Sequence, residues 1–170
     1  MQPASQQQTF KYSWQNTFPE EIRPPSFCRM LVLGVGGAGN NTVTRLMEMG
    51  IVGAECIAIN TDALHLNISK AHRKILIGEK LTKGLGVGGD PQLGRAAIEE
   101  SRKKIEEMLS GADIVFITAG LGGGTGTGAT PVIAEIAKKK GALTVGVVTT
   151  PFRIEKGRIE YAAQALTELR

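Results

Sequence analysis

Residues 112–128 read ADIVFITAGLGGGTGTG, an apolar run followed by a loop of glycine and threonine. The apolar run at 114–117 is β-branched and aromatic, which is typical of a strand buried on both faces of a parallel sheet. The next segment, ATPVIAEIAKKK, repeats apolar residues at helical spacing. A strand, a glycine loop and a helix in this order present backbone N–H groups and a positive helix end to an anion. The stretch therefore predicts a phosphate-binding loop, with a flexible surface loop as the alternative.

The composition indicates one globular domain whose glycines are concentrated in loops. The chain has 170 residues, of which 42% are hydrophobic and 21% charged, and this is ordinary for a folded domain. Glycine is enriched at 22 residues, and these cluster at 34–39, 84–89 and 120–128. Such clustering indicates functional loops rather than low complexity.

Several classes of partner are not expected. Lysine and arginine are scattered and the net charge is only +4, so we expect no nucleic-acid partner. No stretch approaches the roughly 18 apolar residues of a membrane span, and the N-terminus lacks a signal-peptide pattern, so we expect no direct membrane insertion. Cys28 and Cys56 are predicted to be reduced core residues of a cytosolic protein.

The order of the elements predicts an α/β fold with a doubly wound parallel sheet. Residues 1–26 are polar and proline-broken, which predicts a flexible N-terminal arm before a domain at 27–170. Apolar runs predict strands at 28–36, 54–60, 73–78, 114–117 and 142–148. Helices are expected at 40–49, 62–66, 92–110, 129–140 and 155–169. The glycine loops leave carboxyl ends of strands, so we expect them to converge at one edge of the sheet.

The first glycine loop leaves two nucleotide classes open. Gly34, Gly36 and Gly39 satisfy the G-x-G-x-x-G dinucleotide fingerprint, but the same loop would wrap a mononucleotide phosphate chain equally well. An NAD-binding strand would end in an acidic residue, whereas the second strand ends at Asn60 and Asp62 begins the next turn. Asp62 either caps a short helix or faces a nucleotide-bound magnesium ion through water.

Five motifs in a fixed order resemble one known family. They are GVGGAGNN at 34–41, NTDA at 60–63, GGDP at 88–91, GGGTGTG at 122–128 and TTPF at 149–152. On these motifs, residues 27–170 resemble the Rossmann-like GTPase domain of the tubulin/FtsZ family, in its prokaryotic division branch. The resemblance implies GTP or GDP with Mg²⁺ as ligands, head-to-tail self-assembly into protofilaments, division-ring proteins as partners, and a cytoplasmic location at the division site.

The resemblance also implies which residues contact the nucleotide. The first loop would contribute Gly36, Gly37, Ala38, Gly39, Asn40 and Asn41. The central loop would bind the α- and β-phosphates through Gly124, Thr125, Gly126 and Thr127. The γ-phosphate and its water-bound magnesium, with no direct protein ligand to the metal, would be surrounded by Asp62, Ala63, Gly88 and Gly89. Glu155 would hold the ribose hydroxyls, and Arg158 is a further contact, one position short of the family's usual basic residue.

The resemblance further implies that catalysis needs residues outside this sequence. In the family, an acidic loop of the neighbouring subunit completes the site, and that loop follows the segment present here. We therefore expect a truncated or split GTP-binding domain, without its C-terminal domain and without catalytic residues of its own; His65 and His72 are interpreted as ordinary surface or turn residues. The alternatives are a NAD-binding domain of an oxidoreductase and a tubulin-like module that assembles without turnover. A P-loop NTPase is excluded because no G-K-[ST] follows a glycine loop.

Overall fold

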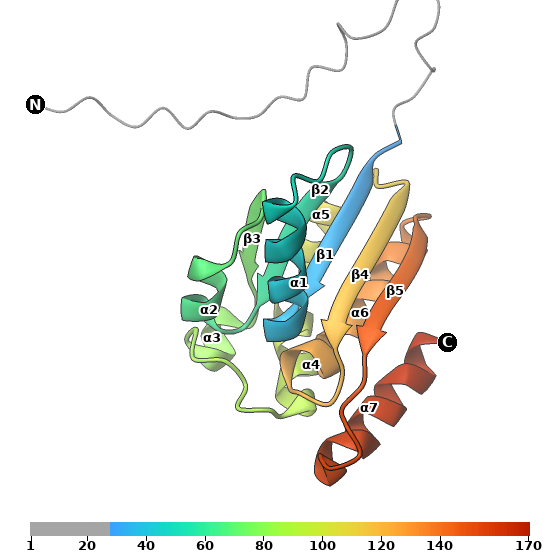
Figure 1. The fold of residues 1–170 in the computed structure, drawn as a ribbon. Coiled ribbons are helices and arrows are strands. Elements are labelled where there is room, and N and C mark those ends of the chain that lie inside the picture. Colours follow the sequence, from blue (N-terminus) through green and yellow to red (C-terminus); the bar gives the residue numbers. More distant parts are fainter. Residues whose placement is uncertain (1–27) are drawn as a thin grey trace, which may run out of the picture.

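In the part of the chain that the structure describes, five parallel strands form a single sheet in the order β3-β2-β1-β4-β5 (Figure 1). The computed structural model describes residues 28–170, so the predicted N-terminal arm lies outside the described residues. The strands are β1 (Met30–Val35), β2 (Glu55–Asn60), β3 (Arg73–Leu76), β4 (Ile114–Gly120) and β5 (Leu143–Thr149). The predicted doubly wound parallel sheet is confirmed, because the chain starts in the middle of the sheet and winds outward in both directions.

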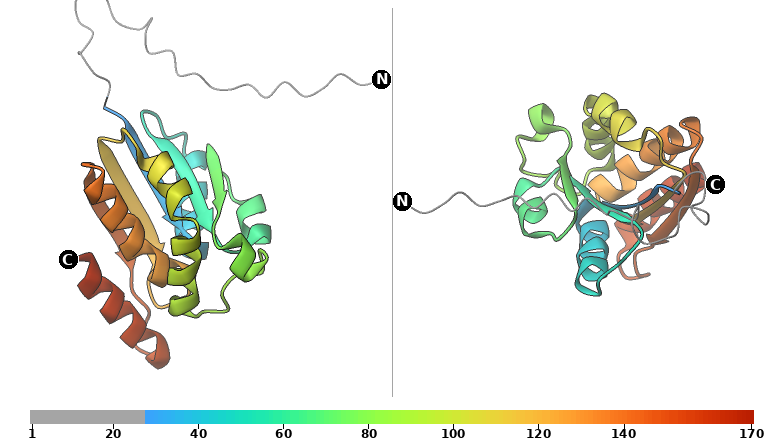
Figure 2. Two further views of the ribbon diagram at one scale, coloured as in Figure 1. Left: turned by 180° about the vertical axis from the view of Figure 1, so that it is seen from behind. Right: turned by 90° about the horizontal axis from the view of Figure 1, so that it is seen from above.

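Helices cover both faces of the sheet, as the two views of Figure 2 show. They are α1 (Gly36–Glu48), α2 (Ala63–Ile68), α3 (Glu79–Thr82), α4 (Pro91–Glu100), α5 (Arg102–Leu109), α6 (Thr125–Lys139) and α7 (Lys156–Leu169). The larger core lies between the strands and α4, α5 and α6, with fully buried side chains such as Leu33, Ile59, Ile105 and Ile133. A smaller cluster beneath α1 joins Val43 to the opposite side of β1 and β2.

Two helices begin earlier than the sequence pattern predicts. We expected loops through 34–39 and 122–128, but α1 begins at Gly36 and α6 at Thr125. The glycines of the first motif serve close packing: a Cβ on Gly39 would lie 2.3 Å from the carbonyl oxygen of Thr118, and one on Gly34 would lie 2.4 Å from that of Gly39. The helix can therefore rest directly on β1 and β4, and the strand passes into it without a loop.

Two other expectations are corrected. The helix expected at 92–110 divides at Ser101, whose backbone (φ −99°, ψ 9°) leaves the α region and whose hydroxyl accepts the N–H of Gly78. The Ser101 hydroxyl thereby ties the break between α4 and α5 to Gly78, the residue that precedes α3. Cys56 is buried as predicted and burial raises its pKa, but Cys28 is exposed because it precedes β1.

Within residues 28–170, no helix combines the length and the apolar character that crossing a membrane requires.

Candidate nucleotide-binding site

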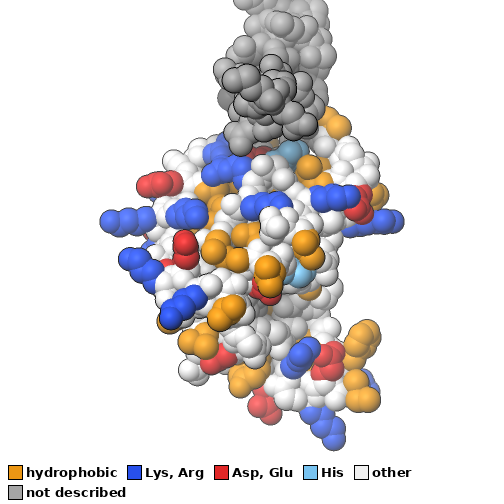
Figure 3. Space-filling model, turned by 90° about the vertical axis from the view of Figure 1, so that its left-hand side faces the viewer, with side chains coloured by type: hydrophobic (Ala, Val, Ile, Leu, Met, Phe, Trp, Pro, Cys, Tyr) orange, Lys and Arg blue, Asp and Glu red, His pale blue; other side chains and the backbone are white. Residues whose placement is uncertain are grey.

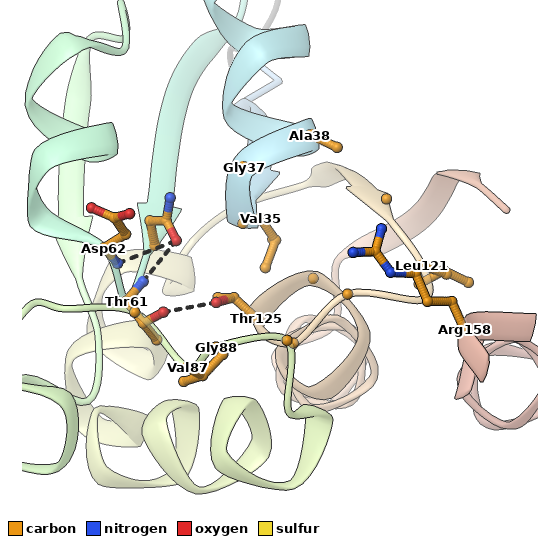
Figure 4. Close-up of a pocket in the computed structure, with 18 of the residues that line it drawn as sticks. Val35, Gly37, Ala38, Thr61, Asp62, Val87, Gly88, Leu121, Thr125 and Arg158 are labelled. Carbon is orange, nitrogen blue, oxygen red and sulfur yellow. Dashed lines mark hydrogen bonds between the residues drawn. The ribbon is translucent and has the colours of Figure 1, made fainter. Parts of the chain in front are cut away.

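A cavity of about 700 Å³ opens at the carboxyl edge of the sheet. Its volume is within the range of small-molecule sites, roughly 300–1,000 Å³. In Figure 4, Thr61 and Asp62 lie on one side, Leu121 and Arg158 lie on the opposite side, and the start of α1 and Thr125 lie between them. The expected convergence of the glycine loops at this edge is confirmed, because all three clusters line the cavity.

The amino ends of α1 and α6 meet at the centre of the cavity. Gly36 starts α1 with a positive φ of 70°, and a Cβ there would lie only 2.8 Å from the backbone nitrogen of Gly126. Neither helix has an acidic residue in its first turn, so no carboxylate of these turns neutralises the positive helix ends. Unsatisfied N–H groups at two adjoining helix starts are suited to bind a chain of phosphates.

The central glycine loop is tied down from within. Thr127 is almost fully buried, and its hydroxyl accepts the N–H of Gly122 at 2.8 Å. The hydroxyl oxygens of Thr125 and Thr61 lie 2.7 Å apart and share a buried hydrogen bond, which joins the start of α6 to the end of β2 (Figure 4). These bonds hold the loop in one conformation before any ligand arrives, so less ordering is needed on binding.

Asp62 caps α2, which confirms the prediction that it caps a short helix. Its Oδ1 accepts the N–H of His65 at 3.0 Å. Its side chain also lines the cavity, and a carboxylate that meets water and phosphate oxygens fits the way Mg²⁺ is bound beside nucleotides. In residues 28–170, no three His, Cys, Asp or Glu side chains form a group that could hold a metal ion by themselves.

Two asparagines organise the turn behind the cavity. The Oδ1 of Asn60 accepts the N–H groups of Thr61 at 2.9 Å and Asp62 at 3.4 Å. Asn40 is fully buried, and the amide orientation that suits its neighbours donates to the carbonyl oxygen of Gly34 at 2.7 Å and accepts from Asn60 Nδ2 at 3.2 Å. Asn40 thus fixes the junction of β1 and α1 to β2 instead of facing the cavity.

Glu155 and Arg158 lie on the β5 side. Glu155 accepts the N–H of Phe152 through Oε1 at 3.1 Å and a guanidinium hydrogen bond from Arg158 through Oε2 at 2.9 Å. Arg158 extends from α7 toward the cavity in Figure 4. A carboxylate has about four acceptor sites, so Glu155 retains capacity for ligand hydroxyls.

Residues 29–170 match the model of the Tubulin/FtsZ family, GTPase domain. The chain belongs to the tubulin/FtsZ family. It is 58% identical over 141 residues to "Cell division protein FtsZ 2" of Methanocaldococcus jannaschii. The aligned segment covers 83% of this chain and 37% of that protein. The chain therefore spans little more than a third of that relative's length.

Solved structures of the tubulin/FtsZ family have the same fold. An FtsZ dimer of M. jannaschii superposes with a TM-score of 0.82 at 56% identity, over 85% of this chain and 42% of that one. A GTPγS-bound protofilament of CetZ2 from Haloferax volcanii gives a TM-score of 0.73 at 27% identity, over 83% and 46%. The alternative of a NAD-dependent oxidoreductase domain receives no support from these comparisons.

Most contacts implied by the tubulin/FtsZ resemblance line the cavity, and some do not. Those that line it are Gly36, Gly37, Ala38, Asp62, Gly88, Gly89, Gly124, Thr125, Gly126, Glu155 and Arg158. Those outside the lining are Gly39, Asn40, Asn41, Ala63 and Thr127. The structure adds cavity residues that motif reading missed, notably His65, Val87 and Leu121. Val87 could have been predicted as a cavity residue because it lies inside the glycine cluster at 84–89. Nothing in the sequence pattern indicated that His65 would line the cavity.

We expect Thr127→Val to destabilise the fold by about 1–3 kcal/mol, because the near-isosteric change leaves the buried N–H of Gly122 without its acceptor. Urea unfolding measures this. Thr167→Val is the matched control: that hydroxyl bonds the carbonyl oxygen of Ala163 on the exposed face of α7, and its loss should cost no more than about 0.5 kcal/mol. Equal stability of the two variants would show that Thr127 does not hold the loop.

Proposed function

We propose that residues 27–170 are the GTP- and GDP-binding domain of a prokaryotic cell-division GTPase that acts in the cytoplasm at the division site. The observation that carries the proposal is the meeting of two helix starts, α1 and α6, at the floor of a cavity of nucleotide size. The family match and the relatives named as cell division proteins support the same reading. The GTPγS in the related CetZ2 structure supports guanine nucleotides as the ligand class.

The geometry suggests one orientation for the nucleotide. Phosphates would lie against the starts of α1 and α6, where N–H groups are free to donate. The nucleoside would lie toward Pro151, Phe152 and Glu155, which offer apolar surface and a carboxylate for ribose hydroxyls. The terminal phosphate would then lie toward Asp62 and the glycines at 86–89. Bound magnesium would neutralise part of the negative charge of the phosphates beside Asp62.

Self-association is proposed at the same end of the cavity. Leu64 and Leu85 are 80% and 82% exposed, and the N–H of Ala63 bonds the carbonyl oxygen of Gly84, so α2 and the loop after α3 form one surface. Figure 3 shows hydrophobic side chains gathered on this side of the molecule. Exposed apolar side chains beside a functional cavity are typical of a protein interface. A neighbouring subunit seated here would cover the terminal phosphate, as head-to-tail assembly requires.

A competition titration tests the ligand class. We expect GTP and GDP to displace a fluorescent guanine nucleotide at concentrations at least about tenfold lower than ATP or NAD require, because the family match and the GTPγS-bound relative both point to guanine nucleotides. Equal displacement by ATP and GTP would contradict guanine specificity. Preferential displacement by NAD would overturn the proposal in favour of a dinucleotide site.

A further inference from the structure

His65 is held with one ring edge toward the cavity. It lies in α2, half-buried, and lines the cavity opposite the start of α1. A Cβ on Gly37 would lie 4.0 Å from both Cε1 and Nε2 of the imidazole, so this edge faces the first turn of α1. Both backbone polar groups of His65 are hydrogen-bonded. Its N–H donates to Oδ1 of Asp62, and its carbonyl oxygen accepts a hydrogen bond from the hydroxyl of Ser69 at 2.7 Å.

The neighbouring amide determines which nitrogen of His65 carries the proton. Asn60 uses Oδ1 to accept the N–H groups of Thr61 and Asp62, and this fixes the orientation of the amide. Its Nδ2 therefore faces Nδ1 of His65, at 3.3 Å. An amide NH₂ group only donates, so Nδ1 must accept and the neutral ring carries its proton on Nε2. The fold thus presents an N–H donor at the cavity edge of His65.

This donor lies at the end of the cavity away from the nucleoside. In Figure 4, Asp62 lies on the β2 side and Arg158 on the β5 side, with the helix starts between them. His65 follows Asp62 in α2, whereas Phe152 and Glu155 follow β5, and all three line the cavity. A diphosphate that begins at the β5 side and occupies the helix starts leaves the His65 end for one further phosphate. Hydrogen bonds to charged phosphate oxygens are stronger than those between neutral groups.

We propose that His65 is a specificity-determining residue, which donates from Nε2 to the terminal phosphate of GTP and makes the site prefer GTP over GDP. The proposal rests on the proposed function and deepens it. Its distinctive consequence is selectivity: GDP lacks the phosphate that His65 contacts, so its affinity does not depend on the imidazole.

The test compares GTP and GDP affinity in three variants of the whole chain. In His65→Ala we expect GTP binding to weaken about tenfold or more while GDP binding changes less than about twofold, because only one charge-assisted hydrogen bond is lost. His65→Gln keeps an N–H donor of similar reach and should restore GTP binding to within about threefold of the parent chain. Asn67→Ala, an exposed change on the same helix, should leave both affinities unchanged.

Each other outcome overturns the proposal in a recognisable way. Equal weakening of GTP and GDP by His65→Ala would mean that the imidazole only supports α2. Unchanged affinity for both nucleotides would mean that it does not contact the ligand. Failure of the parent chain to bind either nucleotide would instead refute the proposed function itself, and GDP binding by the variant also reports that the site is still folded.

Discussion

Gly123→Val should abolish nucleotide binding and leave the fold intact. A Cβ on Gly123 meets no protein atom within 4 Å, and the residue has no positive φ, so the backbone accepts a side chain. Gly123 nevertheless lines the cavity beside the start of α6. The valine would occupy the space through which phosphate oxygens reach the helix N–H groups. Loss of two such hydrogen bonds corresponds to at least about a 100-fold weaker affinity.

Calorimetric titration with GDP measures the loss, and thermal unfolding measures the fold. We expect a free energy of unfolding within about 0.5 kcal/mol of the parent chain. Gly157→Ala is the matched control, because its Cβ also meets nothing within 4 Å and it lies in α7 outside the cavity lining. Parental affinity in Gly123→Val would show that the central loop does not hold phosphate.

The neighbouring glycine would be a poorer test. A Cβ on Gly124 would lie 2.4 Å from Cγ2 of Val87 and 3.0 Å from the backbone nitrogen of Asp90. A side chain there would displace the second glycine loop, so weaker binding could come from either the loop or the phosphate. Only the structure distinguishes these two glycines, which are equivalent in the sequence GGGTGTG.

The strands and their parallel, doubly wound arrangement were predictable because burial leaves a strong pattern, whereas the strand order comes from the structure. Runs such as residues 114–117 must be covered on both faces, and parallel strands joined by right-handed crossovers place every carboxyl end at one edge. The site could therefore be located from the positions of the glycine loops alone. The residues Gly36, Gly124 and Glu155 were instead implied by the family resemblance, and they line the cavity.

The starts of α1 and α6 could not be predicted, because glycine indicates a loop unless packing requires it. Position 39 in α1 requires glycine because the carbonyl oxygen of Thr118 leaves no room for a side chain. This contact joins residues that are far apart in the sequence, so the sequence pattern does not show it. The role of His65 was missed for a similar reason. Its donor is aimed by the amide of Asn60, whose orientation depends on two backbone N–H groups.

We expect the isolated chain to bind GTP without multiple turnovers. Hydrolysis needs a group that orients or activates the attacking water. Among the described residues, the cavity is lined by the carboxylates of Asp62 and Glu155. The proposed function already assigns Asp62 to the terminal phosphate with its magnesium and Glu155 to the ribose. Nδ1 of His65 accepts from Asn60, so it is not a free base either. The water-orienting group is therefore proposed to come from a neighbouring subunit.

Phosphate release measures this prediction over a range of chain concentrations. The chain alone should release no more phosphate than the Gly123→Val variant, which serves as the background. Addition of the full-length M. jannaschii relative, corrected for its own activity, should produce turnover that rises more steeply than linearly with total protein, because the proposed site forms between two subunits. Steady turnover by the chain alone, proportional to its concentration and lost in Gly123→Val, would place the catalytic group within this chain. Asp62, which lines the cavity next to the proposed position of the terminal phosphate, would then be the first residue to substitute.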